Sequence, residues 1–240
     1  PPAGDGDVVV ARAGDGKIYG LSAASGTRLW VYDSSVPNLT LRGLSMPQVS
    51  GNRVFAGLDN GRVAALRLGD GQPAWEQVVA APTGRNELER LTDVDAIVLV
   101  DGPEVFAVSF GGEIVCLAAD SGRVIWRRSV KSYSGIARLG DLVVVTDDAG
   151  VVWGLEAQSG AAVWKNEDLA WRKLSAPAVY RGSLVVGDYK GYLHWLDPKD
   201  GRIVARSRAG SDPIQAAPVA QSDILYVLGT GGRLTALRVN

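Results

Sequence analysis

The sequence predicts an all-β fold made of repeated, four-stranded antiparallel sheets. Three observations predict it: a five-position pattern recurs along the chain, short β-prone segments alternate with turn residues in each copy, and helical periodicity is weak. Four short strands in a repeat of about 40 to 45 residues are typical of one blade of a β-propeller. We therefore expect about five to six blades in this chain.

The repeat begins with a glycine and continues with an apolar residue at +2, Leu at +5, Gly at +10 and Trp at +14. Six in-phase copies open at Gly16, Gly61, Gly112, Gly150, Gly191 and Gly232. The last position is filled in four copies, by Trp30, Trp75, Trp126 and Trp164. Because this aromatic residue recurs once per blade, we expect it to be buried between adjacent blades rather than to line a cofactor cage.

The fifth copy illustrates the expected strands of one blade. Its segments rich in β-branched or aromatic residues are 175–179, 183–187, 192–196 and 202–206. A Ser-Gly or Asp-Gly pair joins the third segment to the fourth in five copies, which is typical of a tight hairpin. We expect one propeller domain over residues 1–240, with blades at 1–34, 35–82, 83–131, 132–170, 171–209 and 210–240. A helical turn is expected only at 83–91.

The two ends of the repeat array are expected to be incomplete. The first copy, at 7–31, has three recognisable strands and lacks the innermost one, and the last copy ends after its third strand. An open propeller leaves exposed sheet edges, which natural sheets avoid by closure. The sequence therefore predicts a C-terminal piece of a longer propeller.

Composition excludes several classes of site. The 25 Lys and Arg residues balance 26 Asp and Glu residues, which argues against a surface that binds nucleic acid. One cysteine, Cys116, and one histidine, His194, exclude a disulfide framework, a multi-thiolate metal site and the common zinc sites with several histidines. We expect Cys116 to be a buried, inert thiol and His194 to be a packed strand residue. No catalytic residue, metal or cofactor is predicted.

An acidic run between the second and third blades contains four carboxylates: Glu87, Glu89, Asp93 and Asp95. The run could indicate paired carboxylates or a calcium site, but its spacing matches no EF-hand or similar loop. We interpret the run as a solvated loop surface.

Two long connections interrupt the repeat. The connection at 33–46 contains Leu39, Leu41 and Arg42, and the one at 81–95 ends with Asp93 and Asp95. Adjacent blades thus carry a leucine–arginine element and an acidic element before equivalent inner strands. Exposed apolar residues ringed by charge are typical of a protein-binding surface. Alternatively, both leucines belong to the first strand of the next blade.

Four stretches carry a resemblance to a known family: 39–43, 59–63, 90–95 and 184–195. They resemble the PQQ-like propeller repeats and, among these, the BamB family of outer-membrane β-barrel assembly lipoproteins. The resemblance implies an eight-bladed ring on the periplasmic face of the outer membrane. It also implies a lipid anchor at an N-terminal cysteine, which is absent from this chain and is not Cys116.

The same resemblance implies a non-enzymatic scaffold that binds the periplasmic POTRA domains of BamA and assists insertion of β-barrel proteins. The family's BamA-contacting positions fall on Leu39, Leu41, Arg42, Asp93 and Asp95. Unfolded outer-membrane β-barrel substrates are a further possible partner, through β-augmentation.

Two alternatives share the fold. A PQQ-dependent dehydrogenase would need a vicinal cysteine pair and a calcium site, and the single cysteine removes the first of these. The other alternative is a periplasmic propeller that binds a sugar or a peptide.

Overall fold

The computed structural model describes residues 2–33, 45–79, 98–109, 112–132 and 134–238. These residues form 23 β-strands and no helix, so none of them forms a helix that could cross a membrane. The chain divides into two compact units, Pro1–Tyr133 and Ser134–Asn240, which are described separately. The all-β prediction is confirmed.

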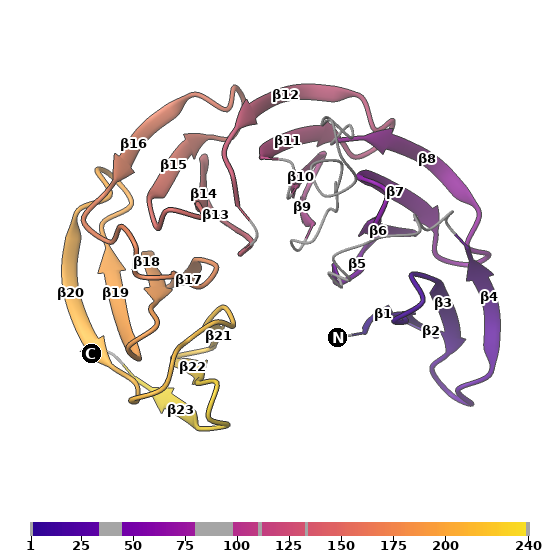
Figure 1. Cartoon of the computed structure of the whole chain (residues 1–240). Helices are drawn as coiled ribbons and strands as arrows, with labels where there is room; N and C mark the ends of the chain where they lie inside the picture. Colours follow the sequence, from indigo (N-terminus) through magenta and orange to yellow (C-terminus); the bar gives the residue numbers. More distant parts are fainter. Residues whose placement is uncertain (1, 34–44, 80–97, 110–111, 133, 239–240) are drawn as a thin grey trace, which may run out of the picture. The chain divides into compact units, whose positions relative to one another are not determined.

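The first unit contains three sheets, each with four antiparallel strands in chain order (Figure 1). The first consists of β1 (Ala3–Asp5), β2 (Val8–Arg12), β3 (Ile18–Ser22) and β4 (Arg28–Tyr32). The second consists of β5 (Gln48–Ser50), β6 (Arg53–Gly57), β7 (Arg62–Arg67) and β8 (Pro73–Val78). The third consists of β9 (Leu99–Asp101), β10 (Glu104–Val108), β11 (Glu113–Ala118) and β12 (Val124–Ser129).

The second unit also contains three sheets, of which the last has three strands. The fourth sheet consists of β13 (Ile136–Leu139), β14 (Leu142–Thr146), β15 (Val152–Glu156) and β16 (Ala162–Asn166). The fifth consists of β17 (Ala178–Tyr180), β18 (Ser183–Gly187), β19 (Tyr192–Leu196) and β20 (Ile203–Arg208). The sixth consists of β21 (Val219–Gln221), β22 (Ile224–Leu228) and β23 (Leu234–Leu237). Each sheet is therefore a blade of the propeller type.

The prediction that the first blade lacks its innermost strand was wrong. Residues Ala3–Asp5 form β1, which pairs with β2 through Ala3–Val10, Gly4–Val9 and Asp5–Val8. The segment has little β propensity of its own, but Gly6, with a φ of +56°, closes a tight turn that brings it against three consecutive valines. The three-stranded last blade is as expected.

The strand positions in the fifth sheet test the expected blade in detail. Strands β18 and β19 have the predicted bounds, whereas β17 starts three residues later than expected and β20 runs from 203 to 208. The helical turn expected at 83–91 lies outside the described residues.

The glycine at +10 closes the hairpin between the third and fourth strands. It has a φ between +69° and +72° in five sheets, at Gly26, Gly71, Gly122, Gly160 and Gly201. Only glycine adopts this left-handed conformation without strain. In each case its N–H donates to the carbonyl four residues earlier, at 2.8 to 2.9 Å.

The tryptophan at +14 joins one sheet to the next within each unit. Its indole N–H donates to a hairpin carbonyl of the following sheet in three cases: Trp30 to Leu68 at 2.8 Å, Trp75 to Ala119 at 3.0 Å and Trp164 to Pro198 at 2.8 Å. The ring lies directly against the hairpin glycine, so that a Cβ on Gly71 would be 2.4 Å from Trp30 Cε3. The repeated Gly and Trp thus form one contact between blades.

The predicted burial of these rings holds for three of the four. Trp30, Trp126 and Trp164 are at most 9% exposed, while Trp75 is half-buried. Around them, apolar residues of the second and third strands form a core in each pair of adjacent sheets within a unit.

Candidate functional site

The five residues predicted to bind a partner lie outside the described part of the chain. Leu39, Leu41 and Arg42 fall within 34–44, and Asp93 and Asp95 fall within 80–97. The structure does describe the strands and flanking residues to which these two segments connect.

Both segments adjoin the second sheet, because 34–44 precedes β5 and 80–97 follows β8 and leads into β9. The flanking residues Ser45, Val79 and Val98 are all buried. Strands β5 and β9 are linked across the two sheets, since the Val100 amide donates to Oε1 of Gln48 at 3.1 Å. The two predicted segments therefore lead into neighbouring inner strands that are fixed to each other.

A buried ion pair joins the first sheet to the second in the same region. The Arg12 side chain is 2% exposed; it donates to the Gly57 carbonyl at 2.9 Å and pairs with Asp59. Asp59 begins the turn before β7, which is one of the stretches that carry the family resemblance. Because removal of one partner would leave a buried charge unpaired, this pair favours one arrangement of the two sheets.

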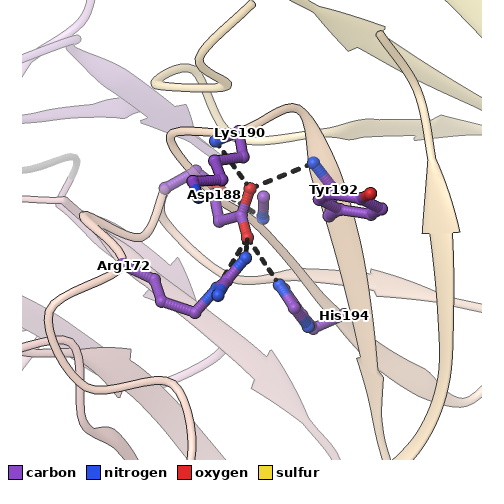
Figure 2. A network of polar contacts seen from close by, with 7 residues as sticks. Arg172, Asp188, Lys190, Tyr192 and His194 are labelled. Carbon is purple, nitrogen blue, oxygen red and sulfur yellow. Dashed lines mark hydrogen bonds and ion pairs between the residues drawn. The ribbon is translucent and has the colours of Figure 1, made fainter. Parts of the chain in front are cut away.

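In the second unit, the described residues contain a buried carboxylate with four donor groups (Figure 2). Oδ1 of Asp188 accepts from the backbone amides of Lys190 at 2.9 Å and Tyr192 at 3.0 Å. Oδ2 accepts from Nε of Arg172 at 2.7 Å and from Nε2 of His194 at 2.8 Å. The Asp188 side chain is fully buried and His194 is 3% exposed. His194 is therefore packed in a strand, as predicted.

The ionisation of this network follows from its contacts. Burial alone raises the pKa of Asp188, but the hydrogen bonds from His194, the Tyr192 amide, Arg172 and the Lys190 amide together hold it below its ordinary value. Burial lowers the pKa of His194, and this effect outweighs the opposing attraction of Asp188. His194 is thus neutral at pH 7, and because a carboxylate can only accept, Nε2 is the protonated nitrogen.

An equivalent arrangement in the preceding sheet shows what this network does. Asp147, at the same position of its turn, accepts from the Val151 amide at 2.8 Å and from Nε1 of Trp153 at 2.9 Å. Trp153 occupies the repeat position of His194, and an indole cannot act as a base. Both aspartates therefore bind their turn to the following strand, and His194 supplies one of the donors for that contact.

Sequence reasoning missed this network, although a signal for it exists. In the fourth and fifth copies an aspartate lies three residues before the opening glycine. A residue whose side-chain ring has an N–H group, Trp153 or His194, lies three residues after that glycine. Arg172 comes from the connection between blades and has no counterpart in the repeat pattern.

We expect the free energy of unfolding to fall as pH decreases from 7 towards about 5, because the unfolded state binds a proton at His194 near its ordinary pKa of 6.5, before the folded state does. Since the chain has one histidine, His194→Gln should flatten this pH dependence while its amide still donates to Asp188. Urea unfolding at a series of pH values measures the slope. An unchanged slope in the variant would contradict the assignment. In the His194→Gln variant, a further fall in the free energy of unfolding below pH 3.8, where Asp188 becomes protonated, should remain.

The remaining candidate groups are the single thiol and any cluster that could hold a metal ion. Cys116 is fully buried in β11, as expected for a structural thiol. Within the described ranges, no group of three or more His, Cys, Asp or Glu side chains is placed to hold a metal ion.

Comparison with known proteins places the chain in a family. A family model described as outer membrane protein assembly factor BamB matches residues 1–166. The chain is 44% identical over 207 residues to the protein of that name from Pseudomonas aeruginosa, covering 86% of this chain and 54% of the relative. It is 46% identical over 204 residues to the one from Xanthomonas campestris, covering 85% and 50%. The chain thus spans about half the length of these curated relatives.

Solved structures agree with the family model. The crystal structure of BamB from Moraxella catarrhalis superposes with a TM-score of 0.92 at 28% identity, over 100% of this chain and 72% of that one. A europium-containing methanol dehydrogenase superposes with a TM-score of 0.69 over 85% of this chain and 50% of that one, and its 12% identity shows the fold alone. The fold is a β-propeller, and the chain belongs to the BamB family of outer membrane protein assembly factors.

Proposed function

We propose that the chain is part of a non-enzymatic scaffold subunit of the outer-membrane β-barrel assembly machinery, anchored at the periplasmic face of that membrane. In this proposal it binds the periplasmic POTRA domains of BamA and so assists the insertion of β-barrel proteins. Relatives named as assembly factors, over most of this chain's length, support the role.

The proposed contact residues are Leu39, Leu41, Arg42, Asp93 and Asp95. The observation that carries this choice is the link between Gln48 and Val100, because it fixes the two inner strands that follow these segments. The leucines would supply the desolvated apolar contact that gives most of the binding energy at the centre of an interface. Arg42 would pair with an aspartate in the second segment or with a carboxylate on BamA.

A triple alanine variant at Leu39, Leu41 and Arg42 should weaken binding of purified POTRA domains by roughly tenfold or more, because interface anchors are lost. Its melting temperature should stay close to that of the parent chain, since exposed ion pairs add about 0 to 1 kcal/mol to stability. Biolayer interferometry with immobilised POTRA domains measures the affinity.

The matched control replaces Arg28, Leu29 and Val31 of β4 by alanine, because Leu29 and Val31 are 51% and 45% exposed. This control should bind as the parent does. Full retention of binding by the first variant would refute the proposed contact. In a separate cycle, Asp93→Arg combined with Arg42→Glu should restore affinity only if these two residues pair with each other.

A further inference from the structure

The fifth sheet carries cations that lie on tyrosine rings. The guanidinium carbons of Arg206 and Arg208 are 4.7 and 5.2 Å from the ring centroid of Tyr192. Nζ of Lys190 is 5.5 Å from the ring centroid of Tyr189. The two groups are close along the chain, since the amides of Lys190 and Tyr192 both donate to Oδ1 of Asp188, and we name these five residues the basic–aromatic surface. Its cations are held in place by the rings, at distances typical of cation–π contacts.

The cations of this surface lack acidic partners among the described residues. Lys190, Arg206 and Arg208 form no ion pair there, whereas Arg202 of the same sheet lies near Asp197 and Asp200. Asp188 does not compensate them, because its carboxylate is fully buried and already bound by Arg172 and His194. The surface therefore presents three positive charges whose counter-ions are not supplied by the described chain.

An exposed tryptophan directly precedes Arg172, whose side chain lies near the ring of Tyr189. Trp171 is 81% exposed, and the next residue, Arg172, places its guanidinium 6.0 Å from the Tyr189 ring. Trp171 has a φ of +64°, which costs about 1 to 3 kcal/mol for a bulky residue and persists only where the surroundings impose it. Its amide donates to the Ala149 carbonyl at 2.7 Å, and the Tyr189 amide donates to the Arg172 carbonyl at 3.1 Å. The indole is thus exposed on a fixed backbone.

We propose that the basic–aromatic surface, together with Trp171, is a second docking site, and that it binds an acidic protein segment. Carboxylates of that segment would meet Arg206, Arg208 and Lys190, since a guanidinium binds a carboxylate through two parallel hydrogen bonds. An apolar side chain of the segment would cover the Trp171 indole. Trp, Tyr and Arg are the residue types enriched at the centres of protein interfaces.

This site consists of other residues than the BamA contact proposed above, and its test does not depend on that contact. An anionic membrane is the other surface that basic residues attract, but lipid-binding clusters generally contain about four to eight lysines and arginines. The three cations here are fewer and are fixed on tyrosine rings, an arrangement that favours a shaped protein partner.

The test uses a short synthetic peptide of alternating Glu and Val as the probe, with Gln/Val and Lys/Val peptides as controls. The Glu peptide should bind in calorimetry, less tightly as salt is raised, and the Arg206→Gln, Arg208→Gln double variant should weaken it by roughly tenfold. The matched control is Arg202→Gln with Arg238→Gln, two exposed arginines that lie near carboxylates. It should change affinity by less than about twofold.

Tryptophan fluorescence supplies a second readout. The Glu peptide should shift the emission of the water-exposed indole to shorter wavelength, and Trp171→Phe should abolish that shift. Equal binding of the Gln peptide, equal loss of affinity in the control variant, or no binding of the Glu peptide would overturn the proposal. Binding of phosphatidylglycerol vesicles without binding of the Glu peptide would assign the surface to a membrane and would also overturn it.

Discussion

Trp164→Ala should lower the free energy of unfolding by about 3 to 5 kcal/mol, the range for removal of a large aromatic side chain from a core. The ring is 9% exposed and packs in a cluster with Val144, Leu184 and Leu196. Its indole N–H also donates to the Pro198 carbonyl of the next sheet. The variant therefore loses a packing contact and a hydrogen bond between two blades. Urea unfolding followed by circular dichroism measures the loss.

Two further variants separate these contributions. Trp164→Phe keeps most of the apolar ring but removes the donor to Pro198, which should cost about 1 to 3 kcal/mol. Trp171→Ala removes a tryptophan that is 81% exposed, and we expect a change within about 0.5 kcal/mol. If Trp171→Ala were as destabilising as Trp164→Ala, burial between blades would not explain the repeated tryptophan.

The repeat pattern predicted this architecture well, because each of its positions has a local conformational cause. The glycine at +10 needs a positive φ, and the apolar residues at +2 and +5 belong to a strand whose side chains alternate between its two faces. The pattern does not reveal that the tryptophan of one copy touches the glycine of the next. That contact forms only when one sheet stacks on the next, and the spacing of residues within one copy carries no information about how the sheets stack.

Other features depended on tertiary context. The β1 segment, Ala-Gly-Asp, is strand only because β2 pairs with it, so its composition did not predict it. The Asp188 network needs Arg172 from a connection outside the repeat. The candidate BamA-binding residues were predicted because they lie in connections that interrupt the repeat and because the family resemblance implies a BamA contact there. They remain a prediction, since 34–44 and 80–97 lie outside the described residues.

Gly201→Ala should be considerably more destabilising than Gly26→Ala, although both glycines close equivalent hairpins with φ values of +72° and +70°. A left-handed backbone costs alanine about 1 to 2 kcal/mol at either position. At Gly26 a Cβ would meet nothing within 4 Å, whereas at Gly201 it would lie 2.2 Å from Cε3 of Trp164. Forcing that ring away should add about 1 to 3 kcal/mol, as overpacking of a core does. Equal losses in urea unfolding would contradict a close Gly–Trp contact.

A double-mutant cycle identifies the clash itself. In the Trp164→Ala background the indole that a Cβ at position 201 would strike is gone, so the second substitution, Gly201→Ala, should cost only the strain of the left-handed backbone, about 1 to 2 kcal/mol. The loss in the double variant should therefore be smaller than the sum of the two single losses. Strict additivity would mean that the glycine is required for its conformation alone. A loss in the double variant that is smaller than this sum would establish that the glycine at +10 also provides the space for the tryptophan of the preceding blade.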